Sequence, residues 1–128
     1  MVKEEDTMSN AQKYCDFDQF EKLNTLRHKK VLTDVTISIG DREFAAHKFV
    51  LCSMSDFFTA MFTSDFEEKN SSNAKIGEEH VNADVFEQII EFGYTGIIEI
   101  TERNAFDLFE ACQYLRLESL QMAATQFL

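Results

Sequence analysis

Apolar residues recur along this chain at spacings that change from helical to alternating and back. Between residues 17 and 26 every third position is apolar, a spacing that gives a helix one broad apolar stripe. The stripe consists of Phe17, Phe20, Leu23 and Leu26. Asp16 or Asp18 can cap this helix, and its last turn is cationic, as the helix dipole favours. We therefore predict a helix over residues 16–30 whose apolar stripe needs a covering surface.

A strictly alternating run follows at residues 35–39 and a shorter one at 42–46, with a glycine turn between them. Two alternating runs joined by so short a turn predict a β-hairpin. Over residues 49–62 the apolar period becomes helical, and the polar residues Ser53, Ser55 and Asp56 interrupt it and offer a new N-cap. We predict two short helices there.

The second half of the chain contains several short elements. Residues 63–74 are polar and loop-like apart from Phe66. The elements predicted after this loop are a short strand at 75–77, a helix from Asn82 or Asp84 to Gly96, a strand at 97–100, a helix capped by Thr101, and a last helix. The apolar positions of the last two helices are Ala105, Leu108, Cys112 and Leu115, then Leu117, Leu120, Ala124 and Phe127. Few short strands among many short helices predict an α+β fold.

Composition narrows the function classes. A chain of 128 residues with 45% apolar residues is most simply one globular domain. Thirteen of its 16 aromatic residues are Phe, which carries no polar group and so indicates a dry core. Its formal charge is −11, and residues 31–128 carry all of it, with 17 acids against six bases. Nucleic-acid binding needs clustered Lys and Arg, so we predict no nucleic-acid partner.

The N-terminus has no apolar core of a signal peptide, and no apolar run approaches the roughly 20 residues of a membrane span. We therefore expect no membrane partner and a cytoplasmic protein, with the nucleus as the alternative. Three scattered cysteines are too few for a disulfide framework.

No spacing in the sequence predicts catalysis. The chain has no CxxC or HxxxH pair for zinc and no glycine-rich phosphate loop. A nucleophile pair assembled in space from His47 with Cys52 or Cys112 stays open as an alternative. We favour the simpler interpretation, in which both cysteines act as small apolar residues on helical faces. We thus predict no enzyme, no cofactor, no metal and no small-molecule substrate.

From Asp34 to Leu128, about three-quarters of the chain, the sequence resembles the BTB/POZ domain. The matching residues are Asp34-Val35, Phe44-Ala45-Ala46-His47-Lys48, Val50-Leu51, Ser55-Asp56-Phe57-Phe58, Ala60-Met61-Phe62, Phe86, Tyr94-Thr95-Gly96 and the late helix from Ala111 to Leu115. The leading helix is similar to the N-terminal extension of the kelch-like branch. The run 51–55 is also similar to the sequences of that branch. We expect a flexible polar leader over residues 1–15 and a BTB/POZ domain over 16–128, including the helix 16–30.

The resemblance implies a homodimer in which the first helix packs on the partner chain. The implied interface residues are Phe17, Phe20, Leu23, Leu26, Asp34 and Lys48. Asp34 is expected to be largely buried, which requires pairing or hydrogen bonding. In some transcription-factor relatives the charged pocket of Asp34 with His47 and Lys48 shapes corepressor binding. We favour a structural role, in which these residues pin the hairpin to the following helix.

The segment after Ala60-Met61-Phe62 resembles a partner-binding motif. Phe66-x-Glu68, five residues past Met61, looks like the apolar-x-acid motif of BTB domains that bind cullin-3. The implied contact residues are Ala60, Met61, Phe66, Glu68 and Tyr114. The alternative is that Phe66 packs on its own core and Glu68 is solvated.

Two functions follow from the resemblance. The first is a homodimeric, non-catalytic adaptor that brings substrates to a cullin-3 RING E3 ubiquitin ligase. The second is a transcriptional regulator whose dimer groove recruits corepressor peptides. Kelch-like proteins continue into a helical linker and a propeller, so we expect the substrate-binding part to lie outside this chain. One residue departs from the family: Gly93 stands where a large apolar residue is usual, and we expect a close neighbour there.

Overall fold

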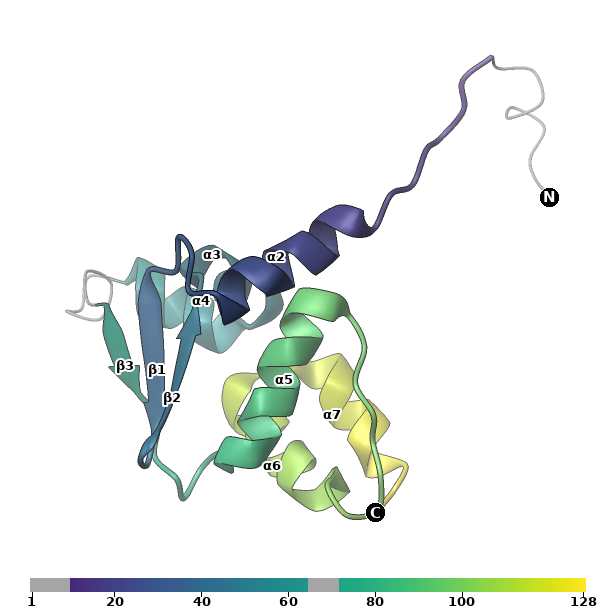
Figure 1. The fold of residues 1–128 in the computed structure, drawn as a ribbon. Coiled ribbons are helices and arrows are strands. Elements are labelled where there is room, and N and C mark those ends of the chain that lie inside the picture. Colours follow the sequence, from purple (N-terminus) through teal and green to yellow (C-terminus); the bar gives the residue numbers. More distant parts are fainter. Residues whose placement is uncertain (1–9, 65–71) are drawn as a thin grey trace.

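The computed structural model describes residues 10–64 and 72–128 (Figure 1). Its elements are α2 (Asp18–His28), β1 (Val35–Ile39), β2 (Arg42–Ala46), α3 (Lys48–Met54), α4 (Asp56–Thr63), β3 (Asn73–Lys75), α5 (Ala83–Thr95), α6 (Ala105–Leu115) and α7 (Glu118–Thr125). A small sheet lies at one side of the domain and the helices form the rest, as Figure 1 shows. The predicted α+β class is confirmed. None of the described helices is long and apolar enough to cross a membrane.

Within residues 10–64 and 72–128 the sheet has three strands, in the order β2-β1-β3. The predicted hairpin is confirmed residue for residue, with Val35 opposite Ala46 and Ile39 opposite Arg42. β3 adds to the other edge of β1 in parallel, with Ala74 beside Ile37. Every second residue of β1 is buried, as expected of a sheet that has one face on the core.

A single serine divides the helical stretch after the sheet. Ser55 has an extended backbone, and its hydroxyl oxygen accepts the Phe58 N–H across 3.3 Å. The same hydroxyl donates to the Leu115 carbonyl, 2.8 Å away at the end of α6. Ser55 therefore ends α3, caps α4 and ties both to α6, which confirms the predicted break.

Phenylalanines fill the space between the sheet and the helices. Phe58 and Phe86 are completely buried, and the Phe86 ring meets Phe44 of β2 edge-on, with 5.1 Å between the ring centres. Within the described chain every buried side-chain nitrogen or oxygen has a hydrogen-bond partner. Arg27 and Ser55 are the only buried polar residues among those that the structure describes, so the core around these rings is apolar, as the composition predicted.

Several predicted boundaries are wrong. Residues 97–100 form no strand. Figure 1 shows the connection from α5 to α6 on the side of the domain away from the sheet, so no described strand lies beside it to pair with. The strand expected at 75–77 lies at Asn73–Lys75, where it is in register with β1. α2 is shorter than predicted, although the Asp16 carboxylate does accept the Asp18 N–H at 3.0 Å.

The last two helices also differ from the prediction in detail. α6 begins at Ala105, one turn later than predicted, but the predicted cap at Thr101 is present: the Thr101 hydroxyl accepts the Asn104 N–H and the Asn104 amide oxygen accepts the Thr101 N–H, as in a capping box. Phe127 lies past the end of α7 and is 46% exposed, so it is not part of that helix's buried stripe. α5 ends as predicted, at Gly96 in a left-handed conformation (φ 79°).

Gly93 in α5 has the close neighbour that the sequence predicted. A Cβ atom at this position would collide with the sulfur of Met54, the last residue of α3. Met54 is partly buried against the core. The Met54 side chain therefore fills the room that a larger residue at position 93 would take.

We expect Gly93→Leu to lower the free energy of unfolding by about 1–3 kcal/mol, because the added side chain overpacks a filled space. Adding Met54→Ala should recover part of this loss, since it vacates that space. Urea unfolding of Gly93→Leu, of Met54→Ala and of the double variant, at one protein concentration, gives the coupling free energy between positions 93 and 54. Additive losses would show that the two side chains do not share the space.

Candidate protein-interaction surfaces

The residues with catalytic potential are engaged in packing and hydrogen bonds. Cys112 is completely buried, and burial raises the pKa of its thiol to about 12. The Cys52 sulfur faces the Phe58 carbonyl oxygen at 3.7 Å. Within the described ranges no three His, Cys, Asp or Glu side chains are grouped so as to hold a metal ion. These two thiols therefore have the surroundings of structural cysteines.

The His47 ring is bonded on both nitrogens, to partners other than a thiol. Its Nδ1 lies 2.6 Å from the Tyr94 hydroxyl and its Nε2 lies 3.0 Å from the Val31 carbonyl oxygen. The backbone N–H of His47 also donates to the Tyr94 hydroxyl at 3.0 Å. A neutral ring protonated at Nε2 satisfies all three contacts. His47 thus connects the sheet to α5 and to the segment after α2, which supports the structural role that we favoured.

A buried arginine holds α2 against its own chain. Arg27 is only 7% exposed, and its guanidinium donates to the Glu91 carboxylate of α5 at 2.6 Å. It also lies 5.0 Å over the Tyr94 ring, and its Nε donates to the Asn24 amide oxygen. Burial is the main reason that the pKa of Tyr94 is raised. The C-terminal half of α2 is therefore part of the domain's own packing.

The N-terminal half of α2 leaves its apolar side chains open. Phe17 is 70% and Phe20 42% exposed, and their ring centres are 6.1 Å apart. With Ile97, which is 76% exposed, they line a hollow of about 500 Å³ beside the segment that follows α5. Burying such a side chain is worth about 1.5–3 kcal/mol, so this hollow favours a covering partner.

The rest of the predicted apolar stripe is less exposed. Leu23 packs against the domain's own core and Leu26 is half-buried. The sequence could not show this division, because it depends on where Arg27 anchors the helix. A role of Leu23 and Leu26 in a dimer interface stays a prediction.

Asp34 is exposed in the single chain, unlike the burial that we expected for it. Its carboxylate accepts the backbone N–H of Lys48, the first residue of α3, at 2.7 Å. A carboxylate at a helix N-terminus is stabilised by the helix dipole. The Lys48 ammonium lies 5.3 Å over the Phe62 ring. The Asp34–Lys48 hydrogen bond pins the start of the hairpin to α3. Burial of Asp34 would need a partner that covers its exposed carboxylate.

Three of the predicted cullin-contact residues lie around one phenylalanine that the sequence analysis did not select. Phe57, Ala60 and Met61 are three and four residues apart on α4, so they share one helix face. The Tyr114 ring of α6 lies against Phe57, with 5.0 Å between the ring centres. Ala60 is exposed, and the other three are half-buried. We call Phe57, Ala60, Met61 and Tyr114 the α4–α6 surface. The other two predicted contact residues, Phe66 and Glu68, lie outside the described residues.

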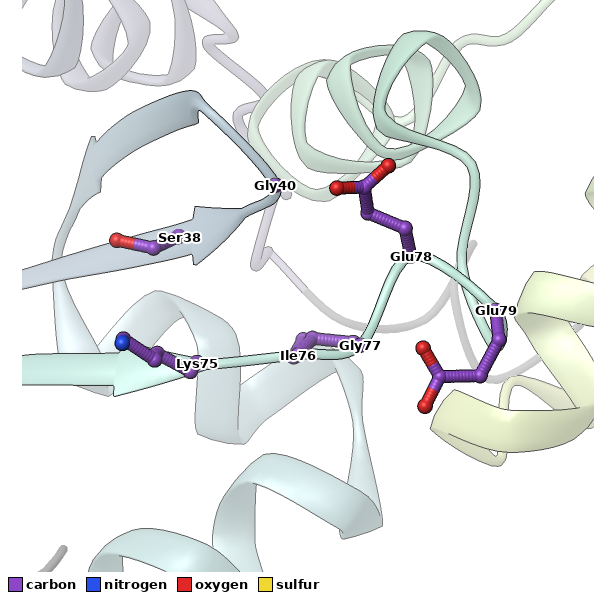
Figure 2. A pocket seen from close by; sticks show the side chains of 7 residues that line it. All are labelled: Ser38, Gly40, Lys75, Ile76, Gly77, Glu78 and Glu79. Atoms are coloured by element: carbon purple, nitrogen blue, oxygen red, sulfur yellow. The ribbon is translucent and has the colours of Figure 1, made fainter.

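A second hollow, of about 570 Å³, lies at the end of the sheet and is lined by Ser38, Gly40, Lys75 to Gly77, Glu78 and Glu79 (Figure 2). Its two carboxylates do not converge. Figure 2 shows the Glu78 side chain directed toward α5 and the Glu79 side chain directed the other way. The two carboxylates are therefore not placed to bind one group together.

The chain belongs to the BTB/POZ domain family, whose model matches residues 23–128. Similar curated sequences include human kelch-like protein 38, 38% identical over 111 residues that make up 87% of this chain and 19% of that protein. Human kelch-like protein 25 is 37% identical over 106 residues, 83% of this chain and 18% of that protein. This chain thus spans about a fifth of the length of these relatives.

Among solved structures, the BTB domain of zebrafish PATZ1 has a TM-score of 0.75 and covers 91% of this chain and 96% of its own. The sequence identity is 22%, so this similarity concerns the fold. Together with the family match it confirms the BTB/POZ fold that the sequence predicted.

We expect a thiol reagent at neutral pH to label Cys15 long before Cys52 or Cys112. Cys15 is exposed, whereas Cys112 is completely buried, and the burial that raises the pKa of its thiol to about 12 disfavours the reactive thiolate at pH 7. Mass spectrometry of the native protein after timed alkylation would show the order. Fast, selective labelling of Cys52 or Cys112 would contradict it, and denatured protein serves as the control for full labelling.

Proposed function

We propose that this chain is a homodimerising BTB domain that acts as a substrate adaptor for a cullin-3 RING E3 ubiquitin ligase. The observation that carries the proposal is the α4–α6 surface, which gathers Ala60, Met61 and Tyr114 around Phe57. The similarity to kelch-like proteins supports the same assignment. The substrate would be held by a part of the protein outside this chain, and the domain would perform no chemistry itself.

The two surfaces serve different steps in this proposal. The hollow formed by Phe20 of α2, Phe17 just before this helix and Ile97 after α5 would be covered by the second copy of the chain. The α4–α6 surface would remain outward for cullin-3, and Phe66 and Glu68 would contribute further contacts to cullin-3. A dimer with two outward surfaces would then bring two substrate-binding parts to two cullins.

We expect the protein to sediment at twice its chain mass of 14.8 kDa at low micromolar concentration. Phe20→Asp should shift it toward the monomer, because the change places a charge on the apolar side of α2 that the partner covers. Lys22→Ala, an exposed change on the same helix, is the matched control. Sedimentation equilibrium measures the mass.

A monomeric wild-type protein under these conditions would contradict the proposed dimer. A dimeric Phe20→Asp protein would place the interface elsewhere. Phe20 is 42% exposed in the single chain, so we expect the Phe20→Asp protomer to stay folded. Circular dichroism of each variant checks this.

We expect Phe66→Ala to weaken binding to the cullin-3 N-terminal domain by about thirtyfold or more, because an interface anchor typically costs 2 kcal/mol or more when truncated. Glu68→Lys should also weaken binding, because it reverses the charge of a proposed contact residue. Both variants should keep the dimer and its melting temperature. Calorimetry of binding and thermal melts on the same samples measure these effects.

If Phe66 instead belongs to the core, Phe66→Ala would lower stability by about 3 kcal/mol and affect binding only through unfolding. Absence of wild-type binding at tens of micromolar would end the adaptor proposal. The alternative function, recruitment of a corepressor peptide to the dimer groove near Asp34 and Lys48, would then take its place.

A further inference from the structure

A continuous series of aromatic rings runs from the core of the domain to its surface. Phe86 and Phe58 are completely buried, with 6.4 Å between their ring centres. The Phe58 ring meets Phe57 edge-on at 5.4 Å, and Phe57 lies 5.0 Å from Tyr114. The inner rings, Phe86 and Phe58, are completely buried, so the outer rings pack against side chains that cannot easily move.

The outermost ring is His80, which the sequence analysis did not select. Its imidazole is stacked on Tyr114, with 4.4 Å between the ring centres and 7° between the planes. One ring face therefore covers Tyr114. The side chain is still 47% exposed, so the other face is open to solvent.

The backbone at His80 is held in place by the turn that precedes α5. The N–H groups of His80 and Val81 both donate to the Gly77 carbonyl, at 3.0 and 3.2 Å, and Val81 is buried directly behind. The Glu79 carboxylate lies 3.6 Å from the His80 Nε2 atom. An aromatic ring that is already ordered loses little conformational freedom when a partner covers it.

We propose that His80 is a contact residue of the α4–α6 surface and that the exposed face of its ring takes an apolar side chain of the cullin. This inference rests on the proposed function and extends its contact set to a third chain segment. His80 precedes α5, whereas Phe57 and Met61 belong to α4 and Tyr114 to α6. Three segments converging on one apolar patch with an ordered aromatic face resemble the centre of an interface, where binding energy concentrates.

The test is the affinity of the full chain for the cullin-3 N-terminal domain, measured by calorimetry. We expect His80→Ala to weaken binding by about tenfold, because it removes the outer ring and exposes Tyr114. His80→Phe keeps a planar apolar ring and should stay within about twofold of the wild type. Phe106→Ala removes an exposed ring from the other end of α6 and is the matched control, with no expected change.

The possible results separate the inference from the proposed function. If the wild type binds and His80→Ala binds equally well or more tightly, His80 is not a contact and this inference fails while the adaptor function stands. If His80→Ala loses affinity in proportion to a lower melting temperature, the stack is structural and the inference also fails. If the wild type does not bind, both fail.

Discussion

The position of α2 depends on one buried charge. Arg27 reaches into the domain from α2, and its guanidinium finds Glu91, Asn24 and the face of Tyr94 there. A buried guanidinium without such partners would be strongly destabilising, so the helix can lie in few other ways. The same tyrosine bonds His47, and through it the end of the sheet and the segment after α2 are connected to α5.

This anchor explains why the apolar stripe of α2 is divided. Near Arg27 the helix lies on α5 and its residues are covered by their own chain. Two turns earlier the helix is covered less by its own chain, and Phe17 and Phe20 are exposed beside Ile97. The protein therefore exposes apolar area at the place where its own packing ends. A second copy of the chain could cover this area.

On another part of the domain, the aromatic core continues to the surface. The rings from Phe86 to Tyr114 form one series, so the proposed partner surface is as firmly supported as the core itself. Rigid aromatic groups that are partly exposed provide contact area at low entropic cost. The same phenylalanines that stabilise the fold thereby position the surface that we assign to binding.

The sequence by itself determined the local elements and the family. The hairpin, the serine break after α3 and the glycine end of α5 each depend on residues close together in the chain, and all were predicted. Only the tertiary structure decided which side of α2 is covered, that residues 97–100 have no strand partner in the described part of the chain, and that His80 stacks on Tyr114. These features join residues far apart in the chain, and no spacing in one sequence encodes which distant side chains meet.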